Sequence, residues 1–417
     1  MKVFKFGGAS VKDPGGIENI CQIISSFDDN LVIVVSAFGK TTNSLEEVVN
    51  RWHAGEKSLE DLLQKLKSYH LAVISSLKSE PGKIMQKFEV SFASLKEYLE
   101  TTEPGDYDYD YDQIVSFGEV WSTIIVAGYL VEAGLPVKWI DARENLITDD
   151  RHRDANIMWG ESIRRFKGSV DFKKSRIYLT QGFIGATSGG ATTTLGREGS
   201  DYSAAIIANI MDAGEVVVWK DVPGILNADP QWLPDAEMIS TLSYKEAVEM
   251  FFSGAKVIHP KTIKPLHNKG IPLFVRSFLN PKANGTAISA GESRTDSLPV
   301  FVRKEDQVLL SLIPLDFSFV MGENLGKVFH VFYKHGIKTN LVQASAVSIA
   351  VCVDNDAERI ERLTEELNDE FRIRYNEDVE MVTLRYYTPE AMARVTAGKT
   401  ILLEQKTRKS IRYVLKK

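Results

Sequence analysis

Cysteine is scarce in this sequence. Only two cysteines occur among 417 residues, Cys21 and Cys352, and they lie far apart in apolar stretches. A disulfide framework needs more cysteines at closer spacing, so the sequence excludes a disulfide-rich secreted domain. We expect both thiols to pack as small buried hydrophobic side chains.

Long apolar runs and an excess of basic charge are also absent. No uncharged apolar run approaches the roughly 18 residues of a membrane span, and the N-terminal MKVFKFGGAS contains no apolar signal-peptide region. The net charge is -6, from 50 basic and 56 acidic residues, whereas nucleic-acid-binding domains usually carry a basic excess. These absences predict a soluble cytoplasmic protein with no nucleic-acid and no membrane partner.

Three familiar ligand-binding motifs are incomplete. GKT at 39–41 lacks the first glycine of a P-loop because Val34 stands at that position, and no G-x-G-x-x-G fingerprint occurs. DYDYDYDQ at 106–113 has the acid spacing of an EF-hand loop, but Tyr111 and Phe117 replace the required Gly and Glu. We therefore expect none of these three architectures, and we expect 106–113 to be a solvated loop.

What the sequence does contain is a repeated alternation of strand and helix. Its length predicts two to three domains. LVIVVSA at 31–37 is a β-branched run without polar alternation, which is typical of a strand covered on both faces of a parallel sheet. Further strands are expected at 3–6, 136–142, 176–187, 215–224 and 271–278, and helices at 17–27, 45–100, 114–134 and 201–214. Ser243 and Glu246 fit the capping box of another helix. We predict an α/β fold with a mainly parallel central sheet and helices on both faces.

The pattern changes after about residue 293. Residues 305–378 follow the order of a ferredoxin-like βαββαβ unit, and 379–417 form a second unit that lacks its final helix and strand. PVFVRK at 299–304 is a candidate strand for the second sheet, and GESRTDSLP at 291–299 is the expected linker. We therefore divide the chain into an N-terminal domain, 1–292, and a C-terminal ferredoxin-like α+β region, 293–417.

Three Gly-rich turns lie within the N-terminal domain. They are FGGAS (6–10), FGK (38–40) and GREGSD (196–201). Glycine after a strand lets the backbone approach a ligand and present N–H groups to an anion, and a following helix adds its dipole. The pattern favours phosphate as the ligand, although glycine also ends strands for purely structural reasons.

Charged residues accompany these turns. Lys5 precedes Gly7 and Gly8 at the carboxyl end of a predicted strand, where ligands bind to open α/β sheets. The alternative is an edge-strand lysine whose stem packs while its ammonium reaches water. For Glu119, Arg197, Asp201 and Lys256, a role in ligand binding likewise competes with a purely structural or solvent-exposed position.

Together these stretches resemble the aspartate kinases of the amino acid kinase family, over nearly the whole chain. The matching stretches are KFGGASV (5–11), VVSAFGKTTN (34–43), SFGE (116–119), QGFIG (181–185), TTTLGREGSDYSAA (192–205), WKDVPGILNADP (219–230), SYKEAVEMFFSGAKVIHPKTIKP (243–265) and NPKANGT (280–286). The βαββ unit after 305 resembles the family's ACT regulatory domains. The resemblance implies an amino acid kinase fold and ATP-dependent phosphorylation of the side-chain carboxylate of L-aspartate to 4-phospho-L-aspartate, the first step of lysine, threonine and methionine biosynthesis.

The resemblance also implies roles for individual residues. The expected catalytic residues are Lys5, Asp201 and Lys256, with both lysines at the phosphates of ATP and Asp201 holding them by charge-assisted hydrogen bonds. Gly7, Gly8, Lys220 and Asp221 complete the expected ATP site. Arg197 is expected to bind the α-carboxylate of aspartate and Glu119 its ammonium, while Ser36, Thr42 and Ser200 line the pocket. Mg²⁺ accompanies ATP and is held mainly by phosphates, so no protein metal site is expected.

The sequence departs from the family pattern at five positions, and three of them, Lys220, Leu226 and Gln231, lie on the nucleotide side. Ala9 lacks the usual hydroxyl, and Glu198 replaces a glycine. Lys220, Leu226 and Gln231 replace a usual Thr, Tyr and Arg. Leu226 keeps apolar surface for a base but no stacking ring, and Lys220 is a candidate replacement for the phosphate partner lost at 231. These changes predict altered nucleotide affinity rather than altered substrate identity.

ACT regions imply a homodimer or higher homo-oligomer with an amino-acid effector, here lysine or threonine. Asn340 stands where Asp is usual, and Ala344-Ser345-Ala346 stands where STSE is common, so two acidic ligand groups are missing. The alternative is a dimerisation module without an effector. For the whole chain, two other functions stay open: a kinase of another small carboxylate, and a non-catalytic amino-acid sensor.

Overall fold

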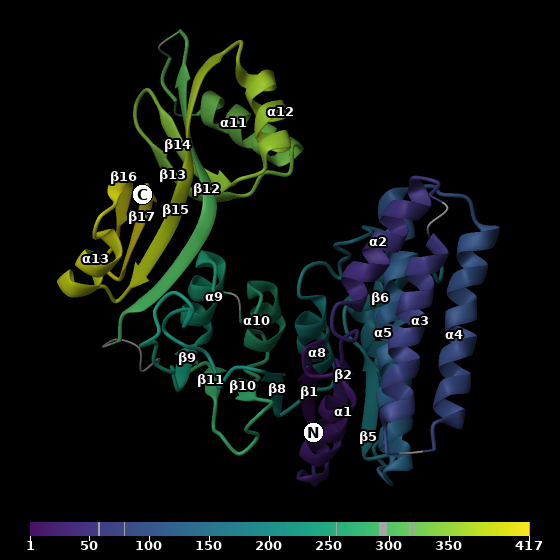
Figure 1. Cartoon of the computed structure of the whole chain (residues 1–417). Helices are drawn as coiled ribbons and strands as arrows, with labels where there is room; N and C mark the ends of the chain where they lie inside the picture. Colours follow the sequence, from purple (N-terminus) through teal and green to yellow (C-terminus); the bar gives the residue numbers. More distant parts are fainter. Residues whose placement is uncertain are drawn as a thin grey trace. The chain divides into compact units, whose positions relative to one another are not determined.

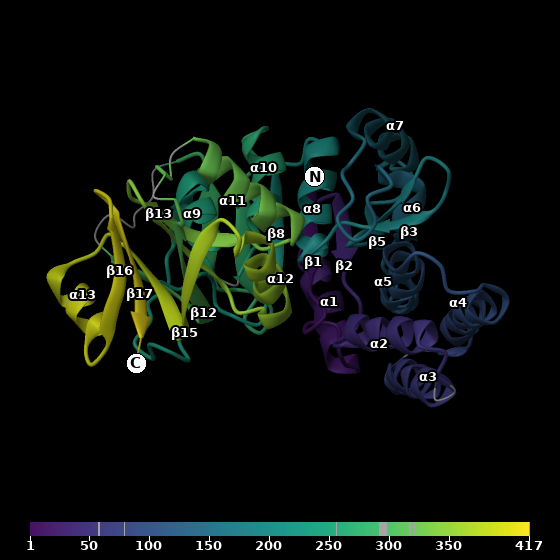
Figure 2. The same cartoon turned by 90° about the horizontal axis from the view of Figure 1, so that it is seen from above.

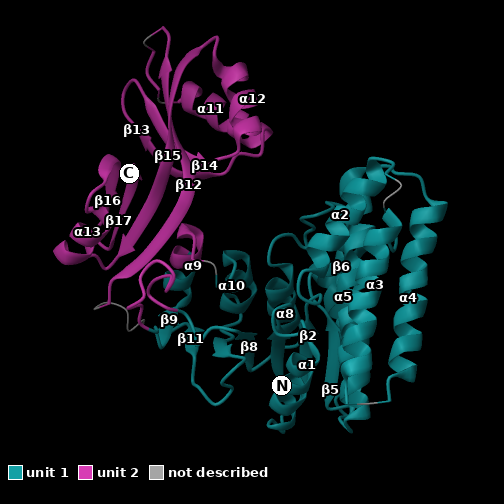
Figure 3. Ribbon diagram, viewed as in Figure 1, with its two compact units in different colours: residues 1–225, 238–248, 257–293 teal, residues 226–237, 249–256, 294–417 magenta. Residues whose placement is uncertain are grey.

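The computed structural model describes residues 1–56, 59–78, 80–255, 257–291, 298–316, 318–320 and 322–416. It divides into two compact units (Figure 3). Unit 1 comprises Met1–Ile225, Met238–Val248 and Val257–Ser293, and unit 2 comprises Leu226–Glu237, Glu249–Lys256 and Arg294–Lys417. The expected domain boundary at 292/293 lies outside the described residues and stays a prediction.

Unit 1 contains the α/β architecture expected from the alternating pattern (Figure 1). Its strands are β1 (Lys2–Phe6), β2 (Leu31–Val35), β3 (Val137–Trp139), β4 (Ile147–Thr148), β5 (Ile177–Gln181), β6 (Ile184–Thr187), β7 (Thr192–Thr194), β8 (Glu215–Lys220), β9 (Thr241–Ser243), β10 (Leu273–Ser277) and β11 (Thr286–Ser289). Its helices are α1 (Pro14–Ser25), α2 (Thr41–His53), α3 (Leu59–Ser76), α4 (Gly82–Thr101), α5 (Tyr107–Glu132), α6 (Ala142–Asn145), α7 (Trp159–Ser169), α8 (Gly199–Ile210) and α10 (Pro260–His267). Helix α9 (Tyr244–Ser253) begins in unit 1 and ends in unit 2.

The central sheet of unit 1 has the strand order β3-β5-β2-β1-β8-β10-β11-β9. All of its neighbouring strands are parallel except β10 and β11, so the mainly parallel sheet is confirmed. A smaller sheet has the order β4-β6-β7. Strand β1 lies between β2 and β8, where Lys5 is opposite Val34 and Val218. This interior position excludes the edge-strand interpretation of Lys5.

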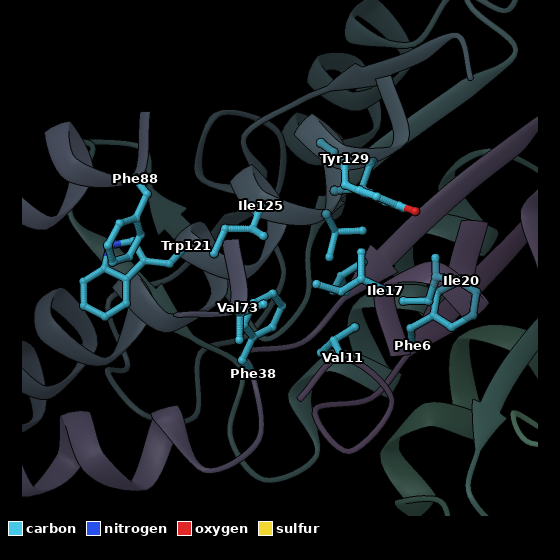
Figure 4. Packing of buried hydrophobic residues seen from close by; sticks show 14 of the residues in the cluster. Phe6, Val11, Ile17, Ile20, Phe38, Val73, Phe88, Trp121, Ile125 and Tyr129 are labelled. Carbon is cyan, nitrogen blue, oxygen red and sulfur yellow. The ribbon is translucent and has the colours of Figure 1, made fainter. Parts of the chain in front are cut away.

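Helices cover both faces of this sheet. Helices α1 and α5 lie on one face, and α8 and α10 lie on the other (Figure 2). The core contains Phe6 from β1, Ile17 from α1 and Trp121 from α5, all without exposed surface (Figure 4). Removing a large apolar side chain from water stabilises the fold by up to about 3 kcal/mol. This apolar core holds the strand ends rigidly in register.

Helix α5 begins earlier than expected. The expectation of a solvated loop at 106–113 is wrong, because Asp106 caps the helix by accepting a hydrogen bond from the backbone N–H of Tyr109. Asp110 and Asp112 are buried within its first turns. The helix is long and apolar enough to cross a membrane, but 78% of its apolar window is buried. It is therefore built as a core helix.

Unit 2 contains an antiparallel sheet in the order β13-β14-β12-β15-β17-β16. Its strands are β12 (Val300–Pro314), β13 (Thr339–Ala344), β14 (Ile349–Asp354), β15 (Phe371–Arg385), β16 (Thr400–Lys406) and β17 (Ser410–Lys416). Its helices are α11 (Glu323–Lys334), α12 (Ala357–Leu367) and α13 (Pro389–Thr396). The order β12-α11-β13-β14-α12-β15 is the expected βαββαβ unit.

Two long strands connect the two parts of this sheet. The first residues of β12 pair with the last residues of β15, which pair in turn with β17, so PVFVRK does join the sheet of the tail. Both strands are irregular near Asp306 and Asp378, which adopt positive φ angles of 52° and 56°. The expected junction at 378/379 therefore falls within β15.

Candidate active site

Two Gly-rich turns meet at the carboxyl edge of the central sheet. The backbone N–H of Ser36 donates to the carbonyl of Phe6 at 3.1 Å, and that of Gly39 donates to the carbonyl of Gly8 at 3.1 Å. A Cβ atom at Gly8 would lie 2.7 Å from the carbonyl oxygen of Ala37, so only glycine permits this approach. The turns after β1 and β2 therefore form one continuous backbone surface.

Two lysines pair with one buried carboxylate beside these turns. Lys5 Nζ lies 2.7 Å from Asp201 Oδ1, and Lys220 Nζ lies 3.2 Å from Asp201 Oδ2. Burial opposes ionisation of Asp201, but the charges of Lys5 and Lys220 outweigh it and hold the pKa of this carboxyl below its usual range. The three groups carry a net positive charge, which suits a phosphate ligand. Lys256, the other lysine expected here, lies outside the described residues.

Glu119 is a buried acid on α5 with an unused oxygen. Its side chain is 3% exposed, and no described residue donates a hydrogen bond to its Oε2 atom. Burial raises the pKa of Glu119 to about 8, while the backbone of Ala37 and the charge of Lys5 oppose this rise. A buried acceptor without a donor costs free energy, so this geometry favours a cationic ligand.

The GREGSD loop leads into α8. Glu198 is the N-cap residue of this helix and adopts a left-handed conformation, φ 53° and ψ 30°. This conformation costs a residue with a Cβ about 1–2 kcal/mol relative to glycine. Burial raises the pKa of Glu198, and the nearby charge of Lys220 opposes this rise. Glu198 therefore places an acidic side chain near Lys220, in surroundings that disfavour its charged form.

The remaining expected site residues lie in the turns that follow strands or near the starts of α2 and α8. Arg197 is exposed, and the described residues provide no ion pair to it. Ser200 is buried against the turn after β5, where a Cβ at Gly182 would lie 2.5 Å from Ser200 Cβ. The other expected residues follow β1, β2 and β8 or begin α2: Gly7, Ser36, Thr42 and Asp221. Of the positions that depart from the family pattern, Ala9 is exposed, and Leu226 and Gln231 belong to unit 2.

Two features of this site were not predicted from the sequence. The first is the pairing of Lys220 with Asp201, since the sequence shows neither residue's orientation. The second is a cluster around Asp112, which accepts a hydrogen bond from Thr194 and lies within hydrogen-bond distance of His152 Nδ1. The spacing in the sequence could have indicated Asp112, because this residue precedes Glu119 by about two helical turns and therefore lies on the same face of α5. Within the described part of the chain, no group of three or more His, Cys, Asp or Glu side chains is placed to hold a metal ion.

Comparisons with known proteins agree with one another. The model of the amino acid kinase family matches residues 1–277. The lysine-sensitive aspartokinase 3 of Escherichia coli (strain K12) is 32% identical over 357 residues, covering 84% of this chain and 78% of the relative. The crystal structure of E. coli aspartokinase III with aspartate and ADP (R-state) gives a TM-score of 0.86 at 28% identity, covering 100% of this chain and 96% of that chain. The structure with lysine and aspartate (T-state) gives 0.81 at 28% identity, covering 99% and 95%.

Proposed function

Because the chain belongs to the amino acid kinase family, and within it to the aspartokinases, we propose that it transfers the γ-phosphoryl group of ATP to the side-chain carboxylate of L-aspartate. The observation that carries this proposal is the Lys5–Asp201–Lys220 cluster near Glu119, whose buried Oε2 atom receives no hydrogen bond from any described residue. The lysine cluster attracts phosphate, and the carboxylate of Glu119 attracts an ammonium. ATP and an α-amino acid supply these two groups.

The nucleotide side of the site consists of lysines and backbone amides. Lys5 and Lys220 contact the phosphates, and Asp201 fixes the direction of both ammonium groups. The N–H groups of Gly7 and Gly8 face the same phosphates, in agreement with the close approach of their turn to the turn after β2. Asp221 lies on the adenosine side, and Lys256 is the third expected lysine. Lys220 supplies the positive charge that is absent at Gln231.

The substrate side recognises the α-carboxylate and the ammonium group of an α-amino acid. Arg197 has the planar donor geometry that matches a carboxylate bidentately. Glu119 receives the substrate ammonium, which provides the donor that its Oε2 atom lacks among the described residues. Ser36, Thr42 and Ser200 provide hydroxyl groups at the rim of this pocket. These contacts select an α-amino acid.

Phosphoryl transfer here requires positioning and charge neutralisation. A carboxylate oxygen of aspartate forms a bond to the γ-phosphorus while the bond to the β-phosphate oxygen breaks, and ADP leaves with that electron pair. The nucleophile is already ionised at neutral pH, so no general base is required. The carboxylate of Asp201 is committed to two lysines, so Mg²⁺ fits as an ion held mainly by phosphate oxygens and water, where it neutralises phosphate charge.

The ferredoxin-like region of unit 2 supports a regulatory role. Lys304 Nζ donates to Asn340 Oδ1 at 2.6 Å, and Asn340 Nδ2 donates to Asp354 Oδ1 at 2.8 Å. Asp354 therefore places an acid beside the position where the usual Asp is absent. We assign an amino-acid effector, lysine in the first instance, to this region, in a cytoplasmic homodimer or higher homo-oligomer.

The test is trapping of the acyl phosphate by hydroxylamine. Purified protein with ATP, Mg²⁺ and L-aspartate is expected to form aspartyl hydroxamate, and glutamate, succinate and carbamate are expected to give none. Turnover of one of these acids in place of aspartate would favour the kinase of another carboxylate. Aspartate binding by calorimetry without any hydroxamate would instead favour a non-catalytic sensor.

A further inference from the structure

Helix α5 begins with two buried aspartates that the proposed mechanism does not use. Asp110 and Asp112 are 2% and 0% exposed. Burying an ionised carboxylate is unfavourable unless several donors satisfy it. The two residues therefore have specific partners, and those partners lie in different parts of unit 1.

Asp112 is bonded to the segments that precede and support the GREGSD loop. Its Oδ1 atom accepts from the hydroxyl of Thr194 at 2.6 Å, and Oδ2 lies 2.8 Å from His152 Nδ1. The backbone N–H of Arg153 donates to Oδ2 at 3.1 Å. Burial raises the pKa of Asp112, and these hydrogen bonds oppose the rise. One carboxylate therefore joins α5, β7 and the 152–153 segment.

The neighbouring residue strengthens the same attachment. Gln113 Nε2 donates to the carbonyl of Thr192 at 2.9 Å, and Gln113 Oε1 accepts from the N–H of Thr192 at 3.2 Å. Helix α5 therefore contacts both ends of β7. Gly196, two residues after Thr194, packs tightly on the supporting segment, where its Cβ would lie 2.7 Å from Asp154 Oδ1. The start of the loop therefore lies against the 153–154 segment.

We propose that Asp112 is the positioning residue for Arg197 and thereby determines how tightly aspartate binds. Helix α5 also holds Glu119, about two turns later on the same face. The groups assigned to the substrate ammonium and the α-carboxylate are thus fixed to one rigid helix, Glu119 directly and Arg197 through Asp112 and Thr194. This inference rests on the proposed function. Helix α5 sets the distance between Glu119 and Arg197, the two residues assigned to the substrate.

Asp110 provides a matched control. It accepts from the Tyr98 hydroxyl at 2.9 Å and the Gly105 N–H at 2.8 Å, and lies 3.0 Å from His53 Nε2. It is as buried as Asp112 and also pairs with a histidine, but its partners lie on α2, α4 and the loop before α5. Loss of this carboxylate affects packing of helices rather than the GREGSD loop.

The experiment compares Asp112→Asn and Asp110→Asn in full-length protein by steady-state kinetics with both substrates. Asp112→Asn is expected to raise the KM for aspartate roughly ten- to hundredfold, with the KM for ATP within about threefold of wild type. Asp110→Asn is expected to lower the melting temperature while leaving both KM values unchanged. Equal effects of the two variants on the KM for aspartate would overturn the inference.

A second pair of variants covers the case in which Asp112→Asn does not fold. Thr194→Val removes the hydroxyl that donates to Asp112, and Thr194→Ser retains it. The valine variant is expected to raise the KM for aspartate at least about fivefold and the serine variant to restore it; equal KM values in both would contradict the inference. Absence of aspartyl hydroxamate with wild-type protein would overturn the proposed function itself, so the two failures are distinguishable.

Discussion

At the scale of single residues, the burial of Glu119 is expected to make aspartate binding depend on pH. Burial raises its pKa to about 8 from an ordinary value of 4.5, so the acid holds a proton at neutral pH before substrate binds. An ammonium ligand requires the ionised form. The KM for aspartate is therefore expected to fall about tenfold per pH unit between about pH 6 and pH 8, and to level off above that.

Glu119→Gln provides the control for this dependence, because its amide matches the protonated acid and cannot titrate. The variant is expected to show a high KM for aspartate that does not change over the same interval. The effect of pH on folding stability has the opposite sign. Because folding raises the pKa of Glu119, the free energy of unfolding falls as pH rises from about 4.5 to about 8. Glu119→Gln removes this contribution to the pH dependence of stability. A wild-type KM independent of pH would contradict the assignment of Glu119 to the ammonium.

At the scale of secondary-structure elements, local patterns predicted most of the fold. The uninterrupted run of β2 and the repeated alternation were sufficient for a mainly parallel sheet, because burial on both faces requires such strands. The start of α5 was missed because alternating Asp and Tyr conceals a helical spacing, in which Tyr107 and Tyr111 share a face and Asp106 caps the helix. Apolar periodicity alone does not reveal buried acids.

The arrangement of strands and helices in the folded unit also explains why only part of the candidate site was predicted. Lys5, Glu119, Arg197 and Asp201 were predicted as site residues from contiguous stretches that resemble the aspartate kinases. Asp112 was not found, because its hydrogen-bond partner Thr194 is 82 residues away in the chain. The pairing of Lys220 with Asp201 likewise depends on the positions of β8 and α8 in the folded unit. Non-local contacts of this kind follow from topology rather than from local sequence.

At the scale of the whole molecule, the chain alternates between the two units. Leu226–Glu237 and Glu249–Lys256 interrupt the segments of unit 1 but belong to unit 2. The first of these directly follows the nucleotide-side stretch at Lys220, and the second leads to Lys256. The chain therefore passes from the strand that carries Lys220 into unit 2 within a few residues.

Regulation is therefore expected to be detectable as an effect of a free amino acid on turnover. Added L-lysine is expected to lower the rate of hydroxamate formation, and Asn340→Ala is expected to change the lysine concentration for half inhibition at least about fivefold while preserving the rate without lysine. L-Threonine and L-methionine serve as the comparison ligands. A rate unaffected by all three amino acids would favour an ACT region that serves only for assembly.

The central claim, that the lysine cluster at the sheet edge performs phosphoryl transfer to aspartate, is tested most directly by Lys5→Met in the hydroxamate assay. Lys2→Met is the matched control, because Lys2 lies on the same strand and pairs with Asp29 and Glu215, each at 3.2 Å, away from the site. We expect Lys5→Met to lower kcat by at least about a thousandfold, while Lys2→Met stays within about threefold of wild type and both proteins remain folded by circular dichroism. A folded Lys5→Met protein with kcat within about tenfold of wild type would show that Lys5 is not required for phosphoryl transfer.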